Sequence, residues 1–339
     1  MVSIKDIAKL AGMSPSTVSR VINQKKYVKP EIRKIILDLV EQTGYVPNRA
    51  ARSMVLQRSF TVGIIAPDTF NMFQRQLFSV IEHRLETYGY HTLFFFVKFE
   101  PESEESCLNR LKAEKVDGVI MLHEIKDHRF YDFLEAASMP ALLATFDRKE
   151  SNFCSIHVDE EQSALEAVQH LLSLGHRHID MLSAEGFTFG LKRADGYRMA
   201  LKNAGIAADE KRVVFTPAFT PASGRLGMKT LLQRGHQTSA VFAATDELAI
   251  GAMRAIWEAG LRVPQDISVM GFDDIDISAY LSPGLTTVRQ PLVELGESSA
   301  NLIHCLICGE EVNRAPIILP HTLVLRESTG QPGSGLRKP

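Results

Sequence analysis

The sequence predicts an all-α helix-turn-helix head joined to an α/β body of two doubly wound parallel-sheet subdomains. Short helical patterns broken by a glycine turn fill the start of the chain, and from Phe60 onward short apolar runs alternate with amphipathic stretches. At 339 residues the chain is too long for a single hydrophobic core. The predicted segments are a helix-turn-helix domain over 1–46, a short linker helix over 47–58, a two-lobed body over 59–328 and a disordered tail over 329–339.

The first helices of the head follow from capping residues and apolar spacing. Ser3 with Asp6 forms an approximate capping box, and Gly12 ends the first helix. Ser14 can cap a second helix that has Pro15 at its first position. A third helix, within 29–44, begins at a proline. The expected apolar faces consist of Ile4, Ile7, Ala8, Ala11, Val18, Val21, Ile22, Ile32, Ile35, Ile36, Leu39 and Val40.

The charge and the outward face of the second helix indicate a nucleic-acid partner. Residues 1–58 carry eleven Lys and Arg against four acidic residues, whereas the whole chain has a net charge of -2. Pro15, Ser16, Ser19 and Arg20 face outward, and short side chains followed by an arginine suit the DNA major groove. The alternative is a small helical bundle with no DNA role, which the basic charge disfavours.

The body has the rhythm of strand, helix and strand that gives parallel sheets covered on both faces. Two series of this pattern predict two similar lobes with a cleft between them. The strands are expected at 60–68, 91–98, 117–123, 141–147, 178–184, 212–217, 240–246 and 267–274. The helices are expected near 73–88, 103–114, 127–138, 160–174, 191–204, 223–234 and 247–259.

In such sheets, ligands bind outside the carboxyl ends of the strands. Asp147, Asp246 and Asp273 follow three of these runs, and Arg193 opens a predicted helix. Carboxylates accept hydrogen bonds and a guanidinium donates them, so this set suits a hydroxyl-rich ligand. Asp246 serves equally well as a helix N-cap. Phe73 and Phe219 are placed to stack on a ligand, or else to fill the core.

Four motifs in order resemble the LacI/GalR family of bacterial repressors. They are "TVSRVIN" at 17–23, "GYVPNRAAR" at 44–52, "GHRHID" at 175–180 and "VMGFDD" at 269–274, and the resemblance extends from residue 2 to about 328. It implies a DNA-binding head, a hinge helix and a body like that of periplasmic sugar-binding proteins. It also implies a transcriptional regulator that binds operator DNA as a homodimer. Because the start lacks the apolar core of a signal peptide and no run of about 18 apolar residues occurs, we expect the protein to be cytoplasmic and associated with the nucleoid.

The resemblance assigns roles to residues of the head and the hinge. Thr17 and Ser19 would contact phosphates, while Pro15, Ser16 and Arg20 occupy the base-reading places. A hinge helix of two turns is too short to be stable alone, so we expect it to fold only on DNA. Its DNA-binding residues are expected to be Asn48, Arg49, Ala51 and Met54, with Met54 wedged into the minor groove where the family usually carries leucine.

The resemblance places Arg193, Asp273 and Phe219 where family members contact their effector. The expected effector-binding set is Phe73, Gln74, Asp147, Arg193, Phe219, Thr245, Asp246 and Asp273. Three positions depart from the family pattern: Gln74 stands where an apolar residue is common, Thr245 replaces an asparagine, and Glu160 replaces another. The effector is expected to be a sugar or sugar phosphate, although these departures prevent its identity from being copied from a relative.

Other classes of function are disfavoured. No phosphate loop or nucleophile elbow is present, so we expect no enzyme and no cofactor. The lone Cys305–Cys308 pair lies in the helix-like stretch 300–311 without a second ligand pair, and no metal is expected. A sugar-binding protein of a transport system would carry a signal peptide and would lack the helix-turn-helix head, whereas this sequence shows the reverse. The sequence leaves open a regulator whose body binds a protein instead of a metabolite. It also leaves open the operator sequence and whether the effector acts as an inducer or a corepressor. The tail carries no leucine heptads, which favours a dimer over a tetramer.

Overall fold

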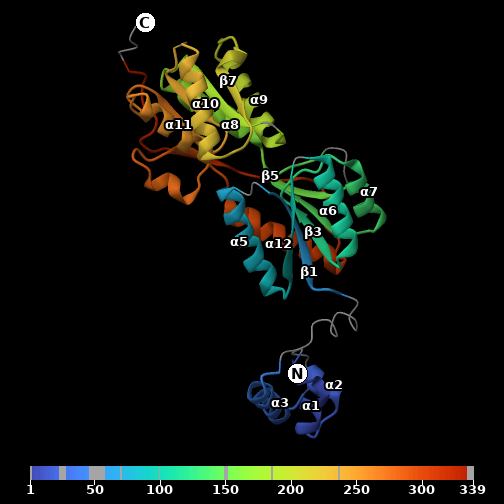
Figure 1. The fold of residues 1–339 in the computed structure, drawn as a ribbon. Helices are drawn as coiled ribbons and strands as arrows, with labels where there is room; N and C mark the ends of the chain where they lie inside the picture. Colours follow the sequence, from blue (N-terminus) through green and yellow to red (C-terminus); the bar gives the residue numbers. More distant parts are fainter. Residues whose placement is uncertain are drawn as a thin grey trace. The chain divides into compact units, whose positions relative to one another are not determined.

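A computed structural model of the chain describes residues 2–22, 28–45, 58–68, 71–98, 100–148, 152–184, 186–235 and 237–333 (Figure 1). The chain divides into two compact units, Met1–Ser59 and Phe60–Pro339, which we call the head and the body and describe separately. The predicted hinge helix, with Asn48, Arg49, Ala51 and Met54, lies outside the described residues.

The head contains three helices, α1 (Ile4–Leu10), α2 (Pro15–Ile22) and α3 (Pro30–Thr43). The predicted capping box of α1 is present, because the Ser3 side chain accepts a hydrogen bond from Asp6 N and the Asp6 side chain accepts one from Ser3 N. Ser14 Oγ accepts a hydrogen bond from Thr17 N at 3.2 Å. At the start of α3, Lys29 provides no side-chain cap.

The core of the head is formed mainly by the predicted apolar faces. Its buried members are Ile7, Ala8, Val18, Val21, Ile36 and Tyr45. Ile35 was expected in this core but is 47% exposed, because it lies one position away from the buried Ile36 on α3. Ile32, Leu39 and Val40 pack against the cluster instead.

The body consists of two lobes, each built on one six-stranded sheet. The N-lobe has sheet order β11-β5-β4-β3-β1-β2 and contains β1 (Thr61–Pro67), α5 (Met72–Thr87), β2 (His91–Val97), α6 (Pro101–Ala113), β3 (Gly118–Met121), α7 (His128–Ala136), β4 (Ala141–Ala144), β5 (Cys154–Val158), α12 (Leu292–Cys308) and β11 (Ile317–Leu319). The C-lobe has sheet order β12-β10-β9-β8-β6-β7 and contains α8 (Glu160–Ser173), β6 (Ile179–Ala184), α9 (Thr188–Asn203), η1 (Glu210–Arg212), β7 (Val213–Thr216), α10 (Pro221–Gln233), β8 (Ala240–Ala243), α11 (Asp246–Glu258), β9 (Ser268–Asp273), η2 (Asp276–Tyr280), β10 (Thr286–Arg289) and β12 (Thr322–Val324).

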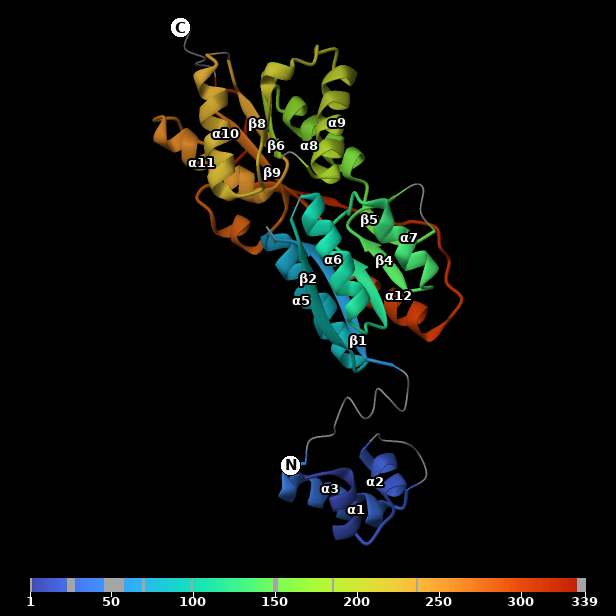
Figure 2. The ribbon, with the colours of Figure 1, turned by 45° about the vertical axis from the view of Figure 1, so that its right-hand side comes forward.

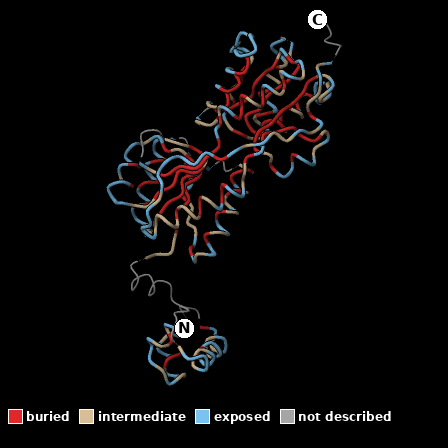
Figure 3. The backbone as a smooth tube through the Cα atoms, turned by 180° about the vertical axis from the view of Figure 1, so that it is seen from behind, coloured by how far each residue is buried: buried red, intermediate tan, exposed pale blue. Residues whose placement is uncertain are grey.

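Three chain crossings join the lobes, after β5, after β10 and after β11. All strand pairs are parallel except β10 with β12. In the N-lobe, α5 and α12 cover one face of the sheet while α6 and α7 cover the other (Figure 2). Buried residues follow the strands of both sheets (Figure 3). The predicted fold class is therefore confirmed.

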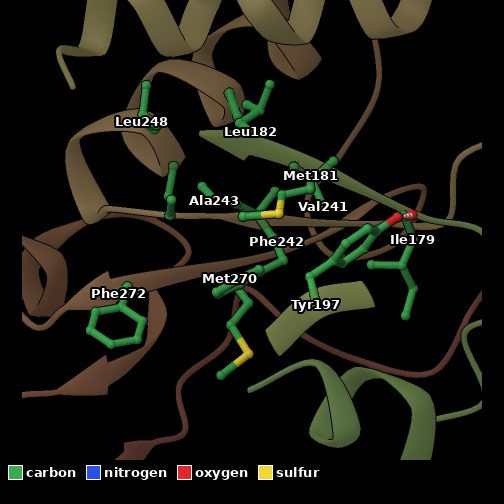
Figure 4. Close-up of a cluster of buried hydrophobic side chains, with 14 of the residues drawn as sticks. Ile179, Met181, Leu182, Tyr197, Val241, Phe242, Ala243, Leu248, Met270 and Phe272 are labelled. Carbon is green, nitrogen blue, oxygen red and sulfur yellow. Dashed lines mark hydrogen bonds between the residues drawn. The ribbon is translucent and has the colours of Figure 1, made fainter. Parts of the chain in front are cut away.

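The C-lobe core holds its helices unusually close together. Figure 4 shows part of this core, including Tyr197, whose hydroxyl donates a 2.8 Å hydrogen bond to Ile179 O. Helices α10 and α11 approach so closely that a Cβ at Gly224 or Gly251 would collide with a backbone carbonyl of the other helix. Because these helices start at the edge where β7 and β8 end, their rigid packing fixes the residues at that edge.

Two parts of the sequence-based prediction need correction. The strands β5, β10, β11 and β12 were not among those expected. The tail was expected to be disordered from residue 329, yet Thr329 Oγ1 lies 3.0 Å from Thr286 Oγ1 and Gly330 N donates to Ser268 Oγ at 3.1 Å. Partly buried hydrogen bonds from Thr329 and Gly330 to β10 and β9 hold the start of this segment in place, despite its Gly and Pro content. Residues 334–339 are outside the described part of the chain.

Candidate functional site

The exposed side of α2 is the candidate DNA-recognition face. Pro15, Ser16 and Arg20 are exposed, Thr17 and Ser19 are half-buried, and the remaining face of the helix packs through Val18 and Val21. Ser14 Oγ lies 2.7 Å from Ser16 Oγ and 2.9 Å from Thr17 Oγ1, so these hydroxyls form a local cluster at the start of the helix. The five residues predicted from the sequence thus lie together on one helix.

Arg193 is the centre of the candidate ligand site in the body. It lies on α9 and is 2% exposed. Its Nε donates to Glu160 Oε2 at 2.6 Å, and its Nη1 lies 2.5 Å from Ala244 O and 3.5 Å from Asp273 Oδ1. The guanidinium carbon also lies 3.5 Å from the centre of the Phe272 ring. Two carboxyl groups and an aromatic face therefore hold the cation in one orientation.

Asp273 closes this arrangement from the end of β9. Its backbone has a φ of 117°, and Asp274 follows with 55°, so two consecutive non-glycine residues adopt the left-handed half of the Ramachandran map. Gln290 Nε2 donates to Asp273 Oδ1 at 2.7 Å. Burial raises the pKa of Asp273 well above its ordinary value, although the Arg193 charge opposes this shift.

Aromatic rings lie beside the Arg193 cluster. Phe219, predicted from the sequence, stacks on Phe189 with ring centroids 4.8 Å apart and meets Phe187 edge-on at 4.9 Å. The Arg193 guanidinium carbon lies 4.8 Å from the Phe189 ring centre. Phe187 and Phe189 were not singled out from the sequence, although "GFTFG" at 186–190 directly follows a strand, which was an available signal. Phe187 and Phe189 line the cavity and offer an apolar wall suited to the C–H face of a sugar, whereas Phe219 packs in the C-lobe core behind them, the alternative weighed for it.

A cavity of about 30 Å³ lies between the lobes, about the volume that one water molecule occupies in the liquid. Its lining comes from both lobes and includes Gln74, Leu122, His123, Glu124, Thr145, Phe146, Gly186, Phe187, Thr188 and Phe189. The Thr188 hydroxyl donates to the Glu124 carboxylate, which joins the N-lobe to the start of α9. This contact links the two walls of the cavity.

Several members of the N-lobe side are held by local hydrogen bonds. Gln74 closes the capping box of α5, since its N donates to Asn71 Oδ1 at 2.8 Å and its Oε1 accepts from Asn71 N at 3.2 Å. Burial lowers the pKa of His123 to about 4, with a smaller contribution from Lys126, so its imidazole is neutral at neutral pH. Sequence reasoning missed His123, Glu124 and Thr188, because their roles depend on the approach of the second lobe.

Other predicted residues lie close by but differ in setting. Asp147 is half-buried and accepts from Ser155 Oγ at 3.1 Å, whereas Phe73 packs in the N-lobe core, the alternative weighed for it. The cap of α11 is Thr245, whose Oγ1 accepts from Leu248 N, so the N-cap role weighed for Asp246 is wrong. Asp246 stands at the first helical position, so its carboxylate points away from the free amides.

Asp246 is fully buried and supports the loop after β9. Its oxygens accept hydrogen bonds from Ser278 Oγ at 2.6 Å, Thr287 Oγ1 at 2.5 Å and Ile275 N at 3.0 Å. Burial raises its pKa to about 7, while these three bonds pull it down. Both oxygens are engaged with protein donors.

Comparison with known proteins assigns the chain to a family. The model of the bacterial regulatory proteins of the lacI family matches residues 3–48, and a periplasmic binding protein-like domain matches 168–329. Catabolite control protein A of Priestia megaterium is 32% identical over 330 residues, covering 97% of this chain and 99% of that protein. The chain belongs to the LacI family. Like its relatives in the LacI family, it is a DNA-binding transcriptional regulator and not an enzyme.

Solved structures of the LacI family agree with this assignment. The lac repressor dimer bound to operator and the anti-inducer ONPF matches with a TM-score of 0.85 at 30% identity, covering 97% of this chain and 99% of that one. A complex of the transcriptional regulator CelR with cellobiose matches with a TM-score of 0.72 at 30% identity, covering 97% and 100%. In the part of the chain that the structure describes, no helix is long and apolar enough to cross a membrane.

Proposed function

We propose that this LacI-family protein is a homodimeric repressor of a carbohydrate-utilisation operon. Its two heads bind a roughly palindromic operator, and a small molecule, a sugar or sugar phosphate, binds in the cleft of the body and changes operator affinity. The observation that carries the effector half is the convergence of Arg193, Glu160 and Asp273 beside three phenylalanine rings at the carboxyl ends of the strands. The relative bound to cellobiose supports a carbohydrate ligand.

In the head, Arg20 is proposed to read a base edge while Thr17 and Ser19 fix the register on phosphates. Pro15 has no side-chain donor and offers only apolar contact, and Ser16 supplies a hydroxyl beside it. Basic charge supplies the sequence-independent part of the binding, which predicts a strong salt dependence. Replacing Arg20 with alanine should lower operator affinity and relax sequence preference by about 1–3 kcal/mol at one base pair.

In the hinge, Asn48, Arg49, Ala51 and Met54 are proposed to contact DNA when two copies of the segment pack side by side. Met54 would insert into the minor groove at the operator centre and kink the duplex. A methionine wedge is more flexible than leucine, so Met54→Leu should bind the operator more tightly and Met54→Ala more weakly. Operator titrations in which both variants match the native protein would remove the wedge.

The C-lobe offers a surface for the second protomer. Trp257 on α11 is 65% exposed and Tyr280 on η2 is 83% exposed, and a pocket of about 400 Å³ lies over α11 and the segment that follows η2. Exposed aromatic residues beside a pocket of this size are typical of protein interfaces. The relation to the lac repressor dimer supports the same state here. Sedimentation should give a dimer, and a stable tetramer at submicromolar concentration would contradict the proposal.

The decisive experiment measures operator affinity of the full-length protein by fluorescence anisotropy across a panel of sugars and phosphorylated sugars. Effector action requires different affinities for two body conformations, so one class of ligand should shift the operator Kd by about fivefold or more. If no sugar shifts operator affinity or binds in calorimetry, the small-molecule half of the proposal is wrong. Binding of a protein partner to the body then becomes the favoured alternative.

A further inference from the structure

The charges around the effector cleft limit the kind of molecule that it can accept. Arg193 is the buried cation nearest the aromatic wall, but Glu160 and Asp273 already contact it at 2.6 and 3.5 Å. All three side chains are no more than 5% exposed. The Glu160 carboxylate alone balances the guanidinium, so Arg193 offers donors to a ligand without offering net positive charge.

The N-lobe side of the cavity adds further negative charge. Glu124 lines the cavity directly, and Asp147 lies three residues past β4. Arg148, the other guanidinium near this side, is stacked over the Tyr131 ring at 4.1 Å, bonded to His128 and 4.0 Å from Glu124. Glu124 is the carboxyl group in the cavity lining, and the guanidinium groups of Arg193 and Arg148 are each already engaged with protein groups.

Three helix starts near the cleft, those of α5, α8 and α11, carry capping or acidic groups. A free helix N-terminus attracts anions, because its amides are unpaired and its dipole is positive. The α8 and α11 starts carry acidic residues in their first turns, and the α5 start is closed by the capping box between Asn71 and Gln74. The α9 start has no side-chain cap, and the Thr188 side-chain hydroxyl there donates to the Glu124 carboxylate, which places an acidic group beside this helix start. At α5, α8 and α11, protein carboxylates and the Gln74 amide therefore take the places that a phosphate would use.

We propose that the effector is an uncharged polyhydroxylated molecule and that phosphorylated and carboxylated sugars are excluded by the carboxylates of Glu160 and Glu124. The hydroxyl groups of a neutral sugar donate to these acceptors and accept from the Arg193 guanidinium, while its C–H face stacks on Phe187 and Phe189. An added phosphate or carboxylate would instead meet buried like charge. Glu160 determines the preference for neutral ligands by neutralising Arg193. Its position is one where the LacI/GalR family carries asparagine. This inference rests on the proposed effector cleft and narrows its ligand class.

The test is isothermal titration calorimetry on the full-length protein with matched ligand pairs. Each neutral hexose or pentose in the panel is compared with its own terminal phosphate and its own uronic acid. The best neutral sugar should bind at least about tenfold tighter than either anionic form. Equal or tighter binding of an anionic form overturns this inference while leaving the effector function intact. A complete absence of sugar binding removes the effector function, and this inference with it.

A pair of variants tests the role of Glu160. Glu160→Gln removes one carboxylate from Arg193 and should reduce the preference for the neutral form by about tenfold. Glu161→Gln removes the same charge from the next residue of α8 and should leave that preference as in the native protein. The ratio of two affinities is not changed by a general loss of stability. If Glu160→Gln is folded by circular dichroism and keeps the native ratio of neutral to anionic sugar affinities, the role of Glu160 is overturned. If that variant fails to fold, the matched ligand pairs measured on the native protein still test the ligand class.

Discussion

The guanidinium of Arg193 lies 2.6 Å from the carboxylate of Glu160, and both side chains are withdrawn from solvent. Two desolvated charges are stable together only when their remaining hydrogen-bonding groups also find partners. For Arg193, Ala244 O and Asp273 complete the set. The pair joins the start of α8 to the first turns of α9, so any ligand that contacts Arg193 acts on two helices of the C-lobe.

Replacing Arg193 with lysine should abolish the effector response while preserving operator binding. One ammonium group cannot reach Glu160, Ala244 O and Asp273 together, and we expect the free energy of unfolding to fall by about 1–3 kcal/mol. Urea denaturation and anisotropy with operator measure the two effects. Arg198→Lys is the control, because Arg198, further along α9, pairs with the exposed Glu210 of η1, and loss of that pair should change stability by less than about 1 kcal/mol. A normal effector response in Arg193→Lys would contradict its assignment.

We expect Asp246 to stabilise the C-lobe through its hydrogen bonds and not through its charge. Asp246→Ala leaves the Ser278 and Thr287 hydroxyls and the Ile275 amide without their acceptor, and should lower the free energy of unfolding by about 3 kcal/mol or more. Asp246→Asn keeps an oxygen for Ser278 and Ile275, and its amide can donate to Thr287, so we expect a loss below about 1.5 kcal/mol. Chemical denaturation ranks the two variants. Equal losses would mean that the carboxylate charge itself is required.

His123 should make the body sensitive to mild acid. Its pKa is lowered from 6.5 to about 4, so between these values the unfolded chain binds a proton that the folded protein does not. Stability is therefore fully present above pH 6.5 and is lost as the pH falls toward 4, by about 2 kcal/mol between pH 7 and pH 5. His123→Gln should remove this part of the pH dependence. Unfolding curves at the two pH values measure it, and an unchanged difference in the variant would locate the acid sensitivity elsewhere.

Lys29→Ser should stabilise the head. Lys29 precedes Pro30 at the start of α3 and makes no cap hydrogen bond, whereas a serine hydroxyl there can accept from a free amide of the first turn. The expected gain is about 0.5–2 kcal/mol, seen as slower hydrogen exchange of α3 amides in the full chain without DNA. Lys34→Ser, at an exposed position within α3, removes the same charge and should give no gain. Faster exchange in Lys29→Ser would contradict the capping argument.

Local signals in the sequence were sufficient for the helices of the head and for most elements of the body. Caps such as Ser3 and Ser14 act within three residues, so the residues that determine them are adjacent in the chain. The strands β5 and β10 escaped prediction because they carry polar side chains in buried places. Thr286 and Thr287 are acceptable there only because Arg326 O and Asp246, distant in sequence, accept their hydroxyl protons.

The sequence by itself determined the trihelical head, the alternation that makes two parallel sheets, and the positions of Arg193, Asp273 and Phe219 near strand ends and helix starts. Each of these depends on spacing along one stretch of chain. The tertiary structure decided that Glu160 neutralises Arg193, that Asp246 supports a loop, and that Glu124 meets Thr188 across the lobes. Those outcomes arise because the chain crosses between the lobes three times and brings distant side chains together in a desolvated cleft. There, hydrogen bonds and charge balance act between residues that are far apart in the sequence.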